Sequence, residues 1–107
     1  MNVLFVCNQG MHRSKTAEKL FRRSFETKSA GLFSEKPLAE AEMQWADTII
    51  VMEEFQRAEL MKRFPALFMQ KRVLTLGIPD IYLKDQPELV AALKEKMKLL
   101  KPLVKLP

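Results

Sequence analysis

The residues best suited to chemistry lie near the N-terminus. The single cysteine of this 107-residue chain, Cys7, is followed six positions later by Arg13 and then by Ser14. Cys7 ends an apolar run over residues 2–7, and the polar segment after it leads into an amphipathic stretch. A loop between a strand and a helix turns backbone N–H groups toward one point at the positive end of the helix dipole. The spacing therefore predicts an anion cradle holding a thiolate nucleophile.

Each side chain of this segment has an expected role. Arg13 can grip two oxygens of a phosphoryl group with its planar fork, and the Ser14 hydroxyl lies within reach of the sulfur. Gly10 supplies the positive φ that such a loop usually needs. The remaining cradle residues are expected to bind the anion with the loop, and they are Asn8, Gln9, Met11 and His12. The alternative is that Cys7 is an ordinary buried thiol.

His12 is the only histidine, and we interpret it as a loop side chain rather than a base. It has no Cys or His partners for a metal, so neither a metal nor another cofactor is expected. One cysteine also excludes an internal disulfide and indicates a protein of a reducing compartment, the cytoplasm.

Length and composition indicate one globular domain over residues 1–107, with 48% hydrophobic residues. No apolar run approaches the roughly 20 residues that span a bilayer, so no membrane partner is expected. The net charge is +5. Six basic residues lie in the last 24 positions among acidic ones, a pattern typical of a solvated helix face. No aromatic residues lie between them, which argues against a nucleic-acid surface.

Short apolar runs alternate with amphipathic ones along the chain. The runs predict strands at residues 2–7, 28–31, 48–52 and 72–76. The amphipathic stretches predict helices at residues 14–26, 37–46 and 53–64, and a last helix that Pro102 ends. This alternation predicts an α/β fold, a parallel sheet with helices on its faces. Cys7 then sits at the carboxyl edge of the sheet, where ligands of such folds bind.

Several segments resemble the low-molecular-weight protein tyrosine phosphatases. They are residues 3–7, the loop through Arg13 and Ser14, and residues 16–18, 29–31 and 46–53. The resemblance implies a three-layer domain with a four-stranded parallel sheet. It also implies a metal-independent phosphomonoesterase, a protein tyrosine phosphatase working through a phosphocysteine. The partners it implies are a phosphorylated protein or small phosphomonoester, and inorganic phosphate or similar oxyanions.

Two positions of the loop depart from that family. The family often has Asn where this chain has Gly10, and glycine tolerates the same strained backbone. Many members have a second cysteine at the position of His12. Without it, neither the protective disulfide nor the thiol relay of the related arsenate reductases can form.

The proton donor is less well marked. The family carries Asp-Pro-Tyr on a late loop, whereas residues 78–82 here read Ile-Pro-Asp-Ile-Tyr. Asp80 follows the last predicted strand and is the expected acid. The rival, Asp85, fits a helix N-cap with Glu88 three residues on, a capping box. Tyr82 resembles the family aromatic that walls the site, and the alternative for it is packing against the last helix.

One other function stays open from the sequence. Because the acid motif is altered, the same Cys–Arg loop suits a catalytically weak module that binds phosphate or a phosphoprotein. The chain is also shorter than usual for the family, which predicts a shallow cleft.

Overall fold

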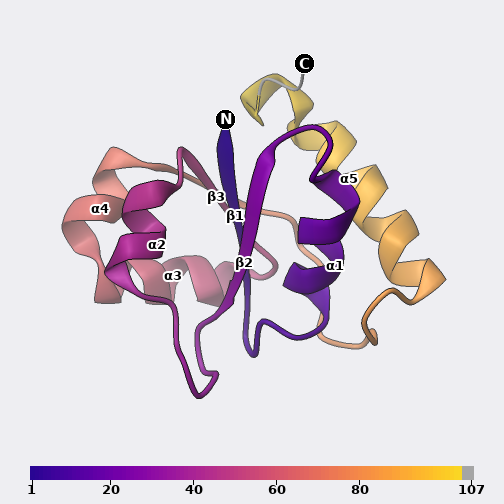
Figure 1. The fold of residues 1–107 in the computed structure, drawn as a ribbon, viewed down its shortest axis with the longest axis horizontal. Coiled ribbons are helices and arrows are strands. Elements are labelled where there is room, and N and C mark those ends of the chain that lie inside the picture. The colour runs from indigo at the N-terminus through magenta and orange to yellow at the C-terminus, as the bar shows by residue number, and fades with distance from the viewer. Residues whose placement is uncertain (105–107) are drawn as a thin grey trace.

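A computed structural model describes residues 1–104, with side chains described through residue 100. Its sheet has four parallel strands in the order β2-β1-β3-β4 (Figure 1). They are β1 (Asn2–Cys7), β2 (Glu26–Gly31), β3 (Thr48–Val51) and β4 (Arg72–Thr75). All of β3 and all of β1 except Asn2 are buried, because helices cover both faces of the sheet.

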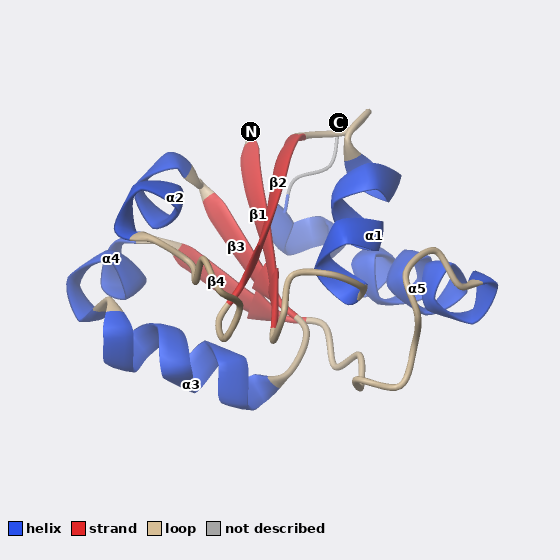
Figure 2. Cartoon of the chain, turned by 60° about the horizontal axis from the view of Figure 1, so that its bottom comes forward, coloured by secondary structure: helices blue, strands red, loops and turns tan. Residues whose placement is uncertain are grey.

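The helices form two layers, one on each face of the sheet (Figure 2). One layer holds α1 (Arg13–Phe21) and α5 (Pro87–Val104). The other holds α2 (Glu40–Trp45), α3 (Glu54–Arg63) and α4 (Pro65–Gln70). Alternate residues of β1 enter opposite cores: Phe5 joins Leu93 of α5, and Leu4 joins Leu60 of α3. The predicted three-layer α/β fold with a four-stranded parallel sheet is confirmed.

Two helices have other boundaries than predicted, one because a strand begins and one because of a local cap. α1 stops at Phe21 instead of residue 26, because Glu26 begins β2 and donates its N–H to the Met1 carbonyl at 3.1 Å. α2 starts at Glu40 instead of residue 37, where the Glu42 carboxylate accepts the Ala39 N–H.

One proline stands where a helix ends, as predicted, and also starts another helix; a second proline does not end its helix. α3 ends at Arg63, just before Pro65. Pro65 stands at the first position of α4, a helix that the sequence pattern did not predict, because proline fits the first turn. α5 runs to Val104, past Pro102, so the predicted end of the last helix at Pro102 is wrong. In the part of the chain that the structure describes, no helix has the length and apolar character needed to cross a membrane.

The connections place a crevice beside the end of β1. The chain leaves β1 through α1 on one face and leaves β3 through α3 on the opposite face, although β1 and β3 are neighbours. Ligands of open parallel sheets bind outside the carboxyl ends of the strands at such a point. Cys7 is the last residue of β1 and therefore stands at this crevice.

Candidate active site

The loop after β1 wraps around the cysteine sulfur. The Gly10 N–H donates a hydrogen bond to Cys7 Sγ at 3.2 Å, and Ser14 Oγ lies 3.1 Å from the same sulfur. Cys7 and Ser14 are buried, and Cys7 is the free thiol of the described residues. An N–H and a hydroxyl are thus both within hydrogen-bonding distance of the sulfur. The predicted reach of Ser14 to the sulfur is confirmed.

Two glycines let this loop sit against the sheet. Gly10 has φ +71°, as predicted, and a Cβ there would also lie 2.8 Å from the Gly31 nitrogen. Gly31 pairs with Cys7 in the β1–β2 register, and a Cβ on it would lie 2.4 Å from the carbonyl carbon of Gln9. The sequence did not predict this role of Gly31, because the strand register creates it.

A cavity of about 50 Å³ opens beside the sulfur. Its lining residues are Cys7, Asn8, Gln9, His12, Arg13 and Asp80. A volume of this size holds one or two water molecules, so a ligand larger than a compact anion must extend from its mouth. The structure thus brings six of the predicted site residues to one cavity.

Four predicted residues do not line the cavity. Gly10 and Ser14 contact the Cys7 sulfur itself, whereas the Met11 side chain is 59% exposed. Tyr82 is half-buried and packs against the core between the sheet, α1 and α5. Tyr82 thus packs in the core, the alternative to a role as a wall of the site. No aromatic side chain of the described residues lines the cavity.

Arg13 is 1% exposed and is held from three directions. Its Nη1 donates to the Ile78 carbonyl at 2.8 Å and pairs with Glu53 Oε2 at 3.0 Å. Its Nη2 lies 3.7 Å from Asp80 Oδ2, a longer and weaker pair. Glu53 was not among the predicted site residues, although it stands two residues after the end of β3, at the same sheet edge as Cys7.

A buried glutamine joins the end of β3 to the loop. Gln56 Oε1 accepts the backbone N–H groups of Met52 and Glu53 at 2.8 and 2.9 Å. Its Nε2 donates to Asn8 Oδ1 at 2.9 Å. This side chain is 0% exposed, so its hydrogen bonds fix the loop rather than solvate the surface. In the sequence, the only indication that Gln56 could bind these amides is its position three residues after Glu53, in the first turn of α3.

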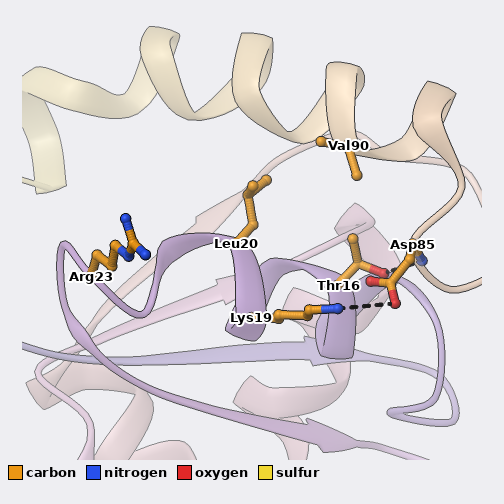
Figure 3. Close-up of a pocket in the computed structure, with 6 residues that line it drawn as sticks. All are labelled: Thr16, Lys19, Leu20, Arg23, Asp85 and Val90. Atoms are coloured by element: carbon orange, nitrogen blue, oxygen red, sulfur yellow. Dashed lines mark hydrogen bonds and ion pairs between the residues drawn. The ribbon is translucent and has the colours of Figure 1, made fainter.

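The two candidate acids lie in different places on the loop between β4 and α5. The Asp80 carboxylate lines the cavity and is 55% exposed. Asp85 points away, and its carboxylate pairs with Lys19 Nζ of α1 at 3.5 Å (Figure 3).

The predicted capping box at Asp85 is wrong. α5 begins at Pro87, so the cap position falls on Gln86. Asp85 has φ +61°, in the left-handed region, and an N-cap residue typically has extended backbone. Its structural role is instead to form the turn before the helix.

A larger hollow lies elsewhere. A groove of about 430 Å³ runs between α1 and α5, with Leu20 facing Val90 across it and Arg23 at one end (Figure 3). It holds neither the thiol nor the buried arginine. We therefore place the candidate site at the smaller cavity, where the nucleophile and the anion-binding group meet.

Comparison with solved structures identifies the fold. The chain superposes on an YwlE arginine phosphatase, a Cys-to-Ser mutant with a phosphorylated active site serine, at TM-score 0.71 and 21% identity, covering 98% of this chain and 94% of that one. It matches the low-molecular-weight protein tyrosine phosphatase of T. tengcongensis at TM-score 0.74 and 22% identity, covering 98% of both chains. The tyrosine phosphatase Wzb of Escherichia coli K30, in complex with phosphate, matches at TM-score 0.73 and 19% identity, covering 94% of this chain and 96% of that one.

At these identities the likeness establishes the fold. This chain is a parallel α/β protein with the fold of the low-molecular-weight protein tyrosine phosphatases. Neither protein-family models nor curated proteins give a match to its sequence.

Proposed function

We propose that the protein is a cysteine-dependent phosphomonoesterase, a protein tyrosine phosphatase in its chemistry. The observation that carries this proposal is the cavity that buried Cys7 and buried Arg13 share, with the Gly10 N–H and the Ser14 hydroxyl on the sulfur. A nucleophile and an anion-binding fork at one small cavity suit a phosphoryl group and little else.

In the first step the Cys7 thiolate attacks phosphorus, and the bond from phosphorus to the ester oxygen breaks. Asp80 gives its proton to the departing oxygen, which leaves as an alcohol or phenol. The product on the enzyme is a phosphocysteine at Cys7. In the second step the Asp80 carboxylate takes a proton from water, the water oxygen attacks phosphorus, and inorganic phosphate and the thiolate are released.

Arg13 supplies the charge for both steps. Its weak pair with Asp80 suits exchange for a phosphoryl oxygen, whereas Glu53 and the Ile78 carbonyl hold Nη1 in place at 3.0 and 2.8 Å. The guanidinium is thus preorganised before substrate enters, and preorganised donors are the main source of stabilisation for developing charge. The same exchange frees the Asp80 carboxyl for proton transfer.

Structures with this fold support the covalent step. One neighbour carries a phosphorylated serine at its active site, and another holds phosphate. For this chain we infer a phosphorylated protein or a small phosphomonoester as substrate, because the 50 Å³ cavity admits a phosphoryl group and leaves the rest of the molecule outside. A single free thiol with no resolving cysteine suits the reducing cytoplasm.

The test is turnover of a chromogenic aryl phosphate in the presence of chelator, with Cys7→Ser as the control. We expect activity that vanadate inhibits and that Cys7→Ser abolishes. Tight phosphate binding without turnover would instead assign the chain as a phosphate-binding module. Turnover that survives in Cys7→Ser would remove the cysteine from the reaction.

A further inference from the structure

The loop that carries Asp80 is tied to the first turn of α1 by two consecutive backbone amides. The Lys84 N–H donates to His12 Nδ1 at 3.1 Å, and the Asp85 N–H donates to Thr16 Oγ1 at 2.9 Å. His12 and Thr16 are four residues apart, so their side chains lie one above the other on the same side of the helix start. The positive φ of Asp85 is part of the turn that presents these two amides. We call this pair of hydrogen bonds the loop clamp.

The clamp matters because the Asp80 carboxylate is weakly held. Asp80 is 55% exposed, and its carboxylate contacts Arg13 through the long 3.7 Å pair. On its N-terminal side the loop is anchored at Ile78, whose N–H donates to Met52 and whose carbonyl accepts from Arg13. On its C-terminal side the anchor is the loop clamp. The position of Asp80 between them depends on both ends being fixed.

We propose that His12 and Thr16 are positioning residues that hold Asp80 over the cavity by accepting the amides of Lys84 and Asp85. The inference rests on the proposed function, in which Asp80 is the acid. Neither side chain needs to touch the reacting atoms for this role. Thr16 is 2% exposed and does not line the cavity of Cys7; it lines the groove between α1 and α5 instead (Figure 3).

A backbone N–H only donates, so His12 takes part in the clamp as an acceptor through Nδ1. An asparagine at this position can place its Oδ1 where Nδ1 accepts, whereas an alanine offers no acceptor. At Thr16, serine keeps the hydroxyl and valine replaces it with a methyl group of the same shape.

The experiment compares His12→Ala with His12→Asn and Thr16→Val with Thr16→Ser, using an alkyl phosphate and an activated aryl phosphate. Displacement of a catalytic group by about 1 Å costs on the order of 100-fold. We therefore expect kcat on the alkyl phosphate to fall by about 10- to 100-fold in Thr16→Val and His12→Ala. The aryl phosphate should lose less, because its leaving group needs little protonation. His12→Asn and Thr16→Ser should recover most of the loss.

Two controls separate positioning from general damage. In an Asp80→Asn background, Thr16→Val should change kcat by less than about twofold, because the group it positions is gone. Lys19→Ala removes the exposed ion pair to the Asp85 carboxylate and spares both clamp hydrogen bonds. It should stay within about twofold of the unmodified protein, as exposed ion pairs contribute little.

Unchanged alkyl phosphate kinetics in both Thr16→Val and His12→Ala, with an active parent protein, would overturn the clamp and leave the proposed function standing. An equal loss on both substrates that persists in the Asp80→Asn background would also overturn it. No turnover in the parent protein would overturn the proposed function and the clamp together. If Thr16→Val does not fold, the His12→Ala and His12→Asn pair decides alone.

Discussion

Gly31→Ala tests whether the fit between the loop and the sheet sets up the anion site. The added Cβ would lie 2.4 Å from the Gln9 carbonyl carbon, 2.6 Å from the Gln9 oxygen and 2.7 Å from the Gly10 nitrogen. Ordinary contact begins near 3.4 Å, so the loop must retreat by about 1 Å. These neighbours are backbone atoms, and no side-chain rotation can relieve the contact.

A retreat of about 1 Å moves the Gly10 N–H and the cradle away from the sulfur. Misplacement of this size costs on the order of 100-fold in rate. Overpacking of a well-packed site costs about 1–3 kcal/mol of stability. We therefore expect kcat/KM on an aryl phosphate to fall about 100-fold, inhibition by vanadate to weaken, and the free energy of unfolding in urea to drop by about 1–3 kcal/mol.

Gly77→Ala is the matched control. Gly77 has φ +76°, but no atom of the described residues lies within 4 Å of the position that a Cβ would take there, so its cost is backbone strain of about 1–2 kcal/mol. Stability should fall in both variants. Vanadate affinity should fall in Gly31→Ala and stay unchanged in Gly77→Ala. Gly31→Ala with kcat/KM within threefold of the parent and unchanged vanadate inhibition would refute the account of the loop.

Three further predictions concern single side chains. Arg13→Lys keeps the charge, but a lysine cannot bind the Ile78 carbonyl, Glu53 and a phosphoryl group at once. Turnover and vanadate affinity should therefore fall by about 100-fold or more. Turnover and vanadate affinity within threefold of the parent protein would remove Arg13 from the site. Asp80→Asn should slow turnover of an alkyl phosphate by about 10²–10⁴-fold and turnover of an activated aryl phosphate less. Asp85→Asn should leave the kinetics nearly unchanged, because Asn tolerates the positive φ of this position. Steady-state rates with both substrates check this, and reversed phenotypes would move the acid to Asp85. Gln56→Leu removes the acceptor of the Glu53 amide and frees Asn8, whereas the Met52 amide keeps its bond to the Val6 carbonyl. Urea unfolding should therefore show a loss of about 1–3 kcal/mol, and activity should fall with it. An unchanged unfolding midpoint would contradict the role given to Gln56.

The parts of the fold that the sequence predicts are those that depend on local pattern. The run at residues 2–7 is apolar on both faces because helices cover both faces of β1, and this pattern needs no knowledge of the partners. The turn from Cys7 to Arg13 is likewise local, and it places the thiol and the arginine at one helix N-terminus. For this reason Cys7 and Arg13 emerge from the sequence. Asp80 emerges from its place after the last predicted strand, at the same edge of the sheet, and all three line one cavity.

The parts that the sequence misses depend on register and on contacts between distant segments. Gly31 bears on the loop because it stands opposite Cys7 in the β1–β2 pairing, which no local pattern encodes. Glu53 and Gln56 reach the site because β3 lies beside β1. The capping box at Asp85 fails because Thr16 takes the Asp85 amide and Lys19 takes its carboxylate, and these partners lie about 70 residues away in sequence.

The most direct test of the central claim is to look for the phosphoryl group on sulfur. The protein is mixed with an activated aryl phosphate, quenched within the first turnovers, digested, and the mass of the peptide carrying Cys7 is measured. We expect that peptide to gain the mass of one phosphoryl group, with Asp80→Asn raising the occupied fraction because the same carboxylate activates water. Cys7→Ala should give neither adduct nor turnover. Steady turnover with no adduct in either protein, or activity that persists in Cys7→Ala, would contradict the account.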